Sequence, residues 1–218
     1  MPETARIDSL LLLGLGGSNK VMAGELSRLL RRAFSQERSK QVLETPPKKI
    51  GPGGLAYPFA ADLAAIAVMY HRTSARVLWG LYQSAQTRLE PLYDELVEAV
   101  AADDRGLLRD GASFSVLAFH PDSVEAGERQ VVGVVKNALV DGAAQRGLHL
   151  RVDAERPDLI FHVRSTKDDQ EQGSLIVSLD LAGRPMHERG YRTQSGPAPL
   201  REDLAANLVM LSRFDGRS

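Results

Sequence analysis

The clearest pattern of apolar and polar residues lies near the C-terminal end of the chain, between positions 174 and 181. Every second residue there is apolar, and most of the intervening residues are serine or aspartate. This period of two predicts a half-buried β-strand. The following Ala182–Pro185 segment contains glycine and proline, so we expect it to end the strand. The apolar positions of the strand are Leu175, Val177, Leu179 and Leu181.

Helical spacing, with apolar residues three or four positions apart, recurs along the rest of the chain. We expect Asp62 to cap the second helix, with Leu63, Ile66, Ala67 and Tyr70 facing inward. In the last helix, which starts at Pro199, the leucines at 200, 204, 208 and 211 recur at helical spacing. The predicted helices cover about 20–35, 62–70, 92–104, 131–147 and 199–211.

The remaining apolar runs are short and predict strands. They lie at 9–15, 41–44, 55–59, 76–82, 113–119 and 159–164. The first part of the chain then has the order strand, helix, two strands, helix, strand, which is typical of a ferredoxin-like domain. Because three further helices and three strands follow, we expect an α+β protein with a second domain.

Composition narrows the possible functions. The chain has 218 residues, a net charge of −1 and no cysteine. The lack of cysteine excludes disulfides, thiol catalysis, iron–sulfur clusters and cysteine-based zinc sites. Without a basic excess, any surface for nucleic acid must be a local patch. The N-terminal apolar run, Leu10–Leu13, is too short for a signal peptide or a membrane span, so we expect a cytoplasmic protein.

One local patch lies on the first predicted helix and just beyond it. Its basic residues are Arg28, Arg31, Arg32, Arg38 and Lys40. They fit a solvated helix face, and they also fit a face that contacts RNA. The pattern leaves both interpretations open.

Two further signals do not support an active site. The glycine-rich turn at 14–20 follows a strand, but Asn19 stands where a dinucleotide fingerprint needs its third glycine, and no Gly-Lys-Ser/Thr follows. A small stand-alone enzyme using this turn remains a rival hypothesis. The five histidines show no metal-ligand spacing, so we expect no metal site. His162 lies in mid-strand, opposite Phe161 and Val163, where we expect an ordinary surface histidine.

Four segments, in order, resemble the bacterial rRNA guanine-N2 methyltransferases that carry a THUMP domain. The last, Ser178-Leu-Asp-Leu-Ala-Gly183, leads into His187-Glu-Arg-Gly-Tyr-Arg192 and Ala198-Pro-Leu-Arg-Glu202. In that family this stretch joins the THUMP domain to the methyltransferase domain. The other three are Arg72-Thr-Ser-Ala-Arg-Val-Leu78, Val135-Lys-Asn-Ala-Leu-Val-Asp141 and Arg156-Pro-Asp-Leu-Ile160. The first 50 residues match the family poorly.

The resemblance implies three parts. Residues 1–88 would form the ferredoxin-like domain, 89–183 the THUMP RNA-binding domain, and 184–218 a hinge with the first helix of a methyltransferase domain. The family's glycine-rich S-adenosylmethionine loop is absent from the sequence. We therefore expect a chain that lacks the catalytic domain beyond Ser218, has no catalytic residues and binds no cofactor by itself.

The function implied is binding of structured RNA, foremost rRNA, as the substrate-recognition module of a guanine-N2 methyltransferase. A separate methyltransferase chain would then be a partner, and neither a membrane nor a metal would be. The alternative is a THUMP-only adaptor that presents tRNA or rRNA to another modifying enzyme.

Residues matching the family's basic positions are candidate RNA contacts, because cations on fixed elements hold phosphates in register. In the segment after Met186, a tyrosine between arginines could stack on a base or could pack as part of a domain linker. The family match gives Arg72, Arg76 and Lys136, and the segment after Met186 adds His187, Arg189, Tyr191 and Arg192. Arg164 and Lys167 are candidates only as local basic residues. For each arginine or lysine, a solvated surface charge is the alternative.

Overall fold

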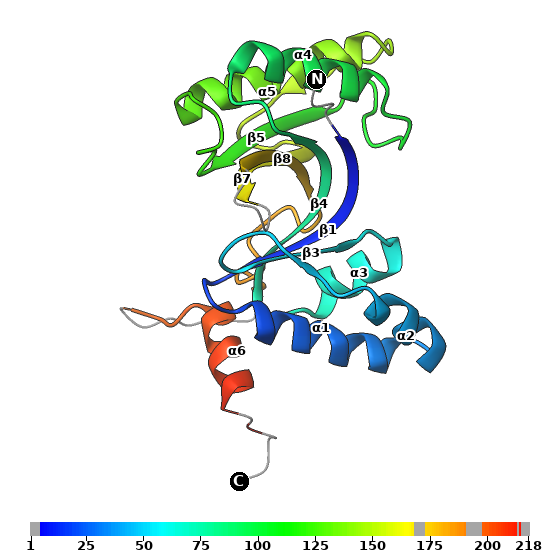
Figure 1. Ribbon diagram of the computed structural model, residues 1–218, viewed down its shortest axis with the longest axis vertical. Helices are drawn as coiled ribbons and strands as arrows, with labels where there is room; N and C mark the ends of the chain where they lie inside the picture. The colour runs from blue at the N-terminus through cyan, green and yellow to red at the C-terminus, as the bar shows by residue number, and fades with distance from the viewer. Residues whose placement is uncertain (1–4, 168–172, 191–197, 213, 215–218) are drawn as a thin grey trace. The chain divides into compact units, whose positions relative to one another are not determined.

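The computed structural model describes residues 5–167, 173–190, 198–212 and 214. Figure 1 shows how its helices and strands follow one another along the chain. The helices are α1 (Asn19–Ala33), α2 (Gln36–Glu44), α3 (Ala61–Tyr70), α4 (Leu89–Ala101), α5 (Glu128–Ala144) and α6 (Glu202–Leu211). The strands are β1 (Ala5–Gly14), β2 (Lys48–Lys49), β3 (Gly54–Pro58), β4 (Ser74–Ser84), β5 (Ser113–Phe119), β6 (Arg151–Val152), β7 (Leu159–Lys167) and β8 (Gly173–Asp180).

The strands hydrogen-bond in the order β2-β3-β1-β4-β8-β7-β5-β6. Pairing is antiparallel between β1 and β3, β2 and β3, and β7 and β8. Strand β5 instead runs parallel to both of its neighbours, β6 and β7. The protein is therefore an α+β fold with a mixed sheet.

Contacts within the chain define two compact units, and each is assembled from separate stretches of sequence. Unit 1 contains Met1–Asp8 and Gly80–Asp180, and unit 2 contains Ser9–Trp79 and Leu181–Ser218. Strands β1 and β4 each contribute residues to both units. The boundaries at 88/89 and 183/184 remain a prediction about domains.

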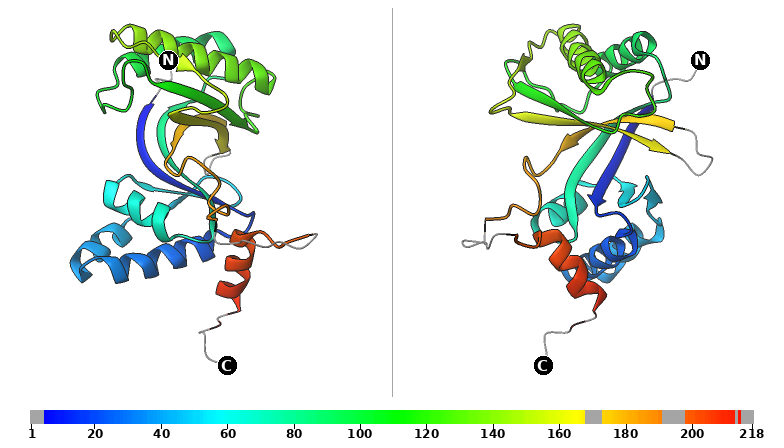
Figure 2. Two further views of the ribbon diagram at one scale, coloured as in Figure 1. Left: turned by 180° about the vertical axis from the view of Figure 1, so that it is seen from behind. Right: turned by 90° about the vertical axis from the view of Figure 1, so that its left-hand side faces the viewer.

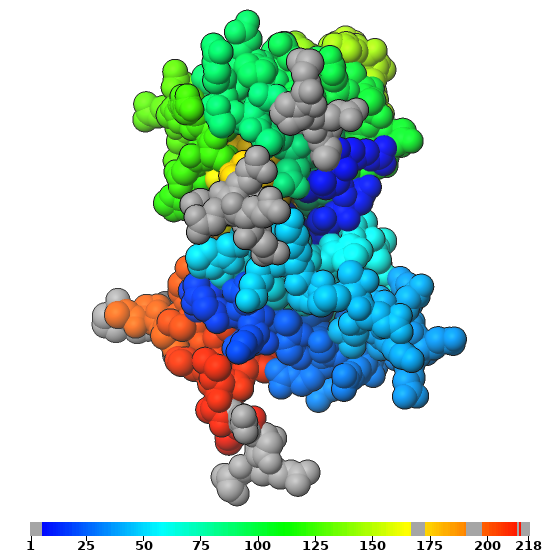
Figure 3. Space-filling view, viewed as in Figure 1, coloured from blue at the N-terminus to red at the C-terminus, as the bar shows by residue number. Residues whose placement is uncertain are grey.

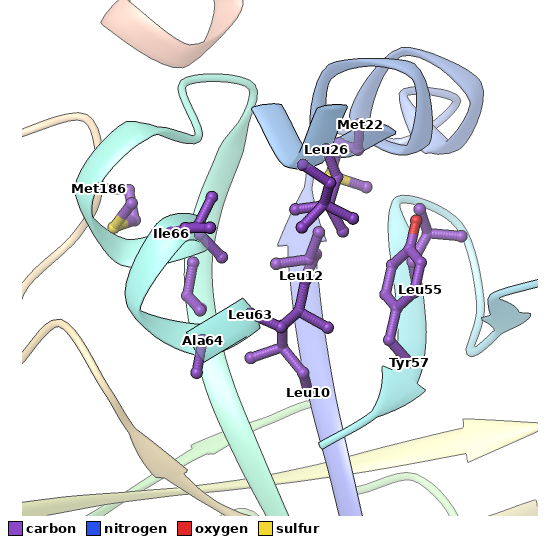
Figure 4. Close-up of a cluster of buried hydrophobic side chains, with 13 residues drawn as sticks. Leu10, Leu12, Met22, Leu26, Leu55, Tyr57, Leu63, Ala64, Ile66 and Met186 are labelled. Carbon is purple, nitrogen blue, oxygen red and sulfur yellow. The ribbon is translucent and has the colours of Figure 1, made fainter. Parts of the chain in front are cut away.

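Unit 2 has a core built around β1 and the helices α1 and α3 (Figure 4). Leu10 and Leu12 of β1 are fully buried, as is Met22 of α1. Each such side chain removed from water stabilises the fold by about 1.5–3 kcal/mol. Met186, more than a hundred residues further along the chain than Leu63, packs into the same cluster. The C-terminal segment is thus part of this core.

Unit 1 packs α4 and α5 together on one face of β5, β7 and β8, as the right-hand view of Figure 2 shows. The helices approach closely at Gly142, where an added Cβ would lie 2.6 Å from the Cβ of Val100. Beneath them, the rings of Phe114 and Phe161 meet edge to face at 6.0 Å. Close helix–helix packing therefore explains a glycine in the last turn of α5.

A buried polar network ties the loop after α4 to the strands of unit 1. The Tyr82 hydroxyl donates to Asp103 at 2.5 Å, and Arg105 donates to Asp103 and to the carbonyl of Ile7. Burial alone would raise the pKa of Asp103, but hydrogen bonds from Arg105 and Tyr82 outweigh it and hold the pKa at about 2. The carboxylate therefore stays ionised.

The predicted strand at 41–44 was wrong, because these residues belong to helix α2. Ser35 caps that helix by accepting the backbone N–H of Arg38 at 3.3 Å. The prediction that Asp62 caps α3 was also wrong, since the N-cap is Ala60. The Asp62 carboxylate instead accepts from the Arg38 guanidinium, with a shortest distance of 2.9 Å.

Strand β8 is not half-buried as its alternation predicted, because both of its faces are covered. Ser174, Ile176, Ser178 and Asp180 are as buried as the apolar residues between them. His162 is likewise not a surface histidine, since it is only 2% exposed and its Nε2 lies 3.0 Å from Asp180. A buried polar pair satisfies hydrogen bonds that the sequence pattern does not reveal.

Helix α6 lies against α1, and Figure 3 shows the two in contact at the surface. Its buried face is polar, and the leucines whose spacing predicts the helix do not mark that face. Asp203 and Asn207 are buried, whereas Leu208 and Leu211 are 50% and 64% exposed. Among the described residues, no helix is long and apolar enough to cross a membrane.

Candidate nucleic-acid interface

A groove with a volume of about 710 Å³ lies on unit 2 between α1, the end of α3 and α6. Helix α1 contributes Arg28 and Arg32, which are four positions apart and so project from the same helix face. Both arginines are exposed. The other lining residues are Glu25, Leu29, Tyr70, Arg72, Val209, Met210 and Phe214.

Arg72 reaches this groove because a buried carboxylate fixes the loop that carries it. Glu25 is 3% exposed and accepts the backbone N–H of Arg72, with 3.1 Å to each carboxylate oxygen. The same carboxylate accepts the backbone N–H and the hydroxyl of Thr73, at 2.9 and 2.7 Å. Helix α1 therefore holds the loop from His71 to Thr73 through one side chain.

His71 braces the same loop from inside unit 2. It is fully buried, and its Nε2 lies 3.0 Å from the carbonyl of Met22. A carbonyl can only accept, so Nε2 carries the proton, and Nδ1 accepts from the Ser74 hydroxyl at 2.9 Å. Burial lowers the pKa of His71, more than the nearby Glu25 carboxylate raises it. The ring is therefore neutral.

Helix α6 closes the other side of the loop through a polar contact. The Asn207 amide donates to the carbonyl of Thr73 at 3.1 Å. On the groove side, the Arg28 guanidinium contacts the Met210 sulfur. Helices α1 and α6, which form two walls of the groove, therefore both hydrogen-bond to the loop from His71 to Thr73.

The surface of the groove combines cations with an aromatic ring. Tyr70 is 55% exposed at the end of α3. Within the described ranges, none of Arg28, Arg32 and Arg72 forms an ion pair. The one lining carboxylate, Glu25, is already saturated with donors from the loop. Such a surface can attract a polyanion and offer a ring for stacking.

A smaller cavity of about 430 Å³ brings two predicted residues together, Arg72 and Arg189, beside Met69 and Tyr70. The Arg189 guanidinium donates to the carbonyls of Met69, at 2.9 Å, and of His71. It also donates to the carbonyl of Met186 at 3.1 Å. These carbonyls include the free ones at the end of α3, so Arg189 caps that helix and has few donors left for a ligand.

Two other predicted residues of unit 2, Arg76 and His187, are half-buried and do not line the groove. Arg76 is half-buried in β4 and has interaction partners inside the protein. His187 is half-buried, with its Nε2 3.6 Å from Glu188 and its Nδ1 buried without a partner in the described structure. Tyr191 and Arg192 lie outside the described residues.

Three predicted residues belong to unit 1. Lys136 is half-buried on α5, and Lys167 is the last residue of β7, paired with Gly173. Arg164 is half-buried, and burial lowers its pKa. Its Nε atom is buried and has no hydrogen-bond partner in the described structure. Of the predicted residues that the structure describes, Arg72 alone lines the groove, and Arg189 lies beside it.

The sequence left Arg28 and Arg32 undecided, and the expectation that Tyr70 faces inward was wrong, because Tyr70 is 55% exposed. The spacing of the two arginines along α1 was a usable signal, but their approach to Tyr70 depends on the tertiary fold. In the described ranges, no group of three or more His, Asp or Glu side chains could hold a metal ion.

Comparison with known proteins connects the chain to methyltransferases. It is 35% identical over 156 residues to the ribosomal RNA large subunit methyltransferase K/L of Pseudomonas putida, covering 70% of this chain and 20% of that protein. It is 45% identical over 83 residues to the protein of that name from Vibrio campbellii, covering 38% and 11%. No protein-family profile matches the chain.

Solved structures share the fold. A predicted N6-adenine-specific DNA methylase from Listeria monocytogenes superposes with a TM-score of 0.68 at 22% identity, over 95% of this chain and 49% of that one. TrmN from Thermus thermophilus superposes with a TM-score of 0.63 at 20% identity, over 94% and 55%. The chain thus spans a quarter or less of these curated relatives and about half of the solved chains.

Proposed function

From the homology of this chain to the N-terminal 20–25% of THUMP-containing rRNA methyltransferases, we propose that it binds structured RNA, with rRNA as the leading candidate. Its role would be to recognise the substrate for guanine-N2 methylation. The chemical step would be carried out by a methyltransferase domain or by a separate chain.

The observation that carries the proposal is the exposed Tyr70 ring beside three arginines that form no ion pair within the described structure. Guanidinium groups fork onto phosphate oxygens, and an exposed ring offers a stacking surface to an unpaired base. The arginines stand on a helix and on a loop fixed by Glu25, so their positions are set before RNA binds. Pre-set donors lose less entropy on binding.

The domain identities belong to the same proposal. Unit 2 contains the order strand, helix, two strands, helix, strand, with α2 added, and its strands pair in the order β2-β3-β1-β4. This supports a ferredoxin-like domain. We assign the THUMP domain to unit 1.

We further propose that S-adenosylmethionine binds only where a methyltransferase domain is supplied. The family's glycine-rich cofactor loop has no counterpart in this sequence. Isothermal calorimetry of the chain with S-adenosylmethionine should give no heat of binding. Saturable binding to the chain alone would refute this part of the proposal and would revive the stand-alone enzyme.

The RNA claim can be tested by titrating the chain with fragments of large-subunit rRNA at several salt concentrations. Neutralising Z phosphates should give a slope of log affinity against log salt of roughly −0.7Z to −0.9Z. Binding that is absent, or that does not depend on salt, would contradict the proposal.

Variants locate the interface. Arg28→Gln, Arg32→Gln and Arg72→Gln should each reduce the magnitude of the salt slope by about one. Arg31→Gln is the matched control, because Arg31 is an exposed arginine on the same helix that does not line the groove. Equal effects of all four substitutions would argue for general electrostatic attraction in place of a groove.

The adaptor alternative makes the same prediction for RNA binding and a different one for partners. A methyltransferase chain should co-purify with this protein if it is a recognition subunit. Co-purification with an unrelated RNA-modifying enzyme would favour the adaptor.

A further inference from the structure

The sheet of unit 1 has a second face, turned away from α4 and α5, that carries exposed apolar residues. Phe114 and Val116 of β5 are buried, whereas Leu117 and Phe119 are 40% and 49% exposed. Side chains alternate along a strand, so Leu117 and Phe119 share the face opposite to Phe114 and Val116. Val152 of the edge strand β6 is 51% exposed too, but it is the register partner of Phe114 and so projects on the other face.

The Phe119 ring rests on a rigid support. It stacks on the His162 ring with centroids 5.4 Å apart and an interplanar angle of 14°. His162 is buried and bonded to Asp180, so it cannot easily turn away. One side of Phe119 is thus covered by an anchored ring, and half of the residue remains accessible.

A cation lies beside this ring in register. Arg164 of β7 is the parallel partner of Phe119, and His162 is the partner of Leu117, so both project on the same face. The Arg164 Nε is buried and finds no acceptor among the described residues. Arg164 as a whole is half-buried and forms no ion pair with another described residue, so an anionic ligand would supply a partner that the described part of the chain does not.

The backbone directly after Phe119 is strained. His120 has a φ of 48°, the one positive φ of a residue other than glycine in the described ranges. Its carbonyl accepts the N–H of Ser165, at the neighbouring end of β7. Strain of this kind persists where surrounding contacts over-determine the backbone, and here it fixes the end of β5.

We infer that this face is a nucleotide site, in which an unpaired base stacks on Phe119 and the adjoining phosphate binds Arg164. The inference rests on the proposed function and names the ligand class that unit 1 takes, a single-stranded stretch of RNA. A ring beside a cation that has no ion-pair partner among the described residues matches the two parts of a nucleotide, an aromatic base and an anionic phosphate. The stack would run from His162 through Phe119 to the base.

The test uses the whole chain and a single-stranded oligoadenosine that contains 2-aminopurine, whose fluorescence falls when it stacks. The wild-type chain should bind and quench the probe. Phe119→Leu keeps an apolar side chain but removes the ring, and should weaken binding about 5- to 150-fold. Phe119→Tyr keeps the ring and should bind within about twofold of wild type.

Arg164→Met keeps the length of the side chain without the charge, and should reduce the magnitude of the salt slope by about 0.7. Val152→Ala is the control for an exposed apolar residue outside the stack and should leave binding unchanged. Circular dichroism of each variant checks that unit 1 is folded.

The inference is overturned if the wild-type chain does not quench the probe, or if Phe119→Leu binds like wild type. This result is distinguishable from failure of the proposed function, which is measured on structured rRNA fragments with the groove variants of unit 2. The nucleotide site is supported if Phe119→Leu loses the quenching of the probe while Val152→Ala binds it normally. If Phe119→Leu leaves the probe bound but changes self-association of the chain, the face is a protein contact and the nucleotide site is refuted.

Discussion

Replacement of Glu25 by glutamine tests whether one carboxylate holds the groove loop. The carboxylate accepts from three donors, the N–H of Arg72 and the N–H and hydroxyl of Thr73. Glutamine keeps one accepting oxygen for Thr73 and turns its NH₂ group toward the N–H of Arg72. Hydrogen bonds to a charged group contribute about 1.5–3 kcal/mol each, and neutral ones about half of that.

The substitution weakens three such bonds and places the glutamine NH₂ against the N–H of Arg72, both of them donors. It should therefore destabilise unit 2 by about 2–3 kcal/mol. The assay is urea unfolding followed by fluorescence of Trp79, the one tryptophan of the chain. Trp79 belongs to unit 2 and stacks on Phe59 at 3.9 Å, so its emission reports that unit. With a slope of about 2 kcal/mol per M, the midpoint should fall by roughly 1–1.5 M urea.

Glu37→Gln is the matched control, because Glu37 is an exposed glutamate on α2 of the same unit. It should change stability by less than about 0.5 kcal/mol. If Glu25→Gln shifted the midpoint no more than this control, the loop would be held by other contacts and the reasoning would be refuted.

Three further predictions concern stability. Burial lowers the pKa of His71, so acid protonates the unfolded state before the folded state. The urea midpoint followed by Trp79 fluorescence should therefore fall as the pH drops below about 6.5. His71→Gln should flatten that pH dependence. An equal pH dependence in the variant would contradict this. Gly142→Ala should destabilise unit 1 by about 1–3 kcal/mol in unfolding followed by circular dichroism, because the added methyl group meets Val100. Gly133→Ala on the same helix has open space around it and should stabilise the unit by up to about 1 kcal/mol. Similar effects of the two substitutions would refute the packing argument. Arg189→Met should lower the Trp79 midpoint by uncapping α3 and should leave the salt slope for RNA unchanged; a reduced slope would instead show a phosphate contact.

Sequence patterns predicted the elements of unit 1 well. The bounds of β5 agree with the prediction, whereas α5 begins and ends three residues earlier than predicted. Where apolar residues keep one period over a long segment, they mark a buried face, and that face determines whether the segment is a helix or a strand. Helix α2 was missed because only Ser39 of that helix is buried, and its visible signal was the Ser35 cap.

The candidate site was predictable only in part. Arg72 was available from the resemblance, but its position depends on Glu25, which lies 47 residues earlier in the chain. The polar face of α6 could not be read from leucine spacing, because Asn207 is buried to satisfy the carbonyl of Thr73. Tertiary hydrogen bonds of this kind override local periodicity.

The division of each unit into separate stretches has a consequence for synthesis on the ribosome. The core of unit 2 includes Met186, which is made after all of unit 1. At 5–20 residues per second, the roughly 100 residues of the intervening segment take roughly 5–20 s to emerge. The N-terminal strands and helices must therefore wait, with apolar surface uncovered, while unit 1 becomes complete and can fold first. A nascent-chain experiment should find unit 1 protected from protease before unit 2, although unit 2 begins closer to the N-terminus.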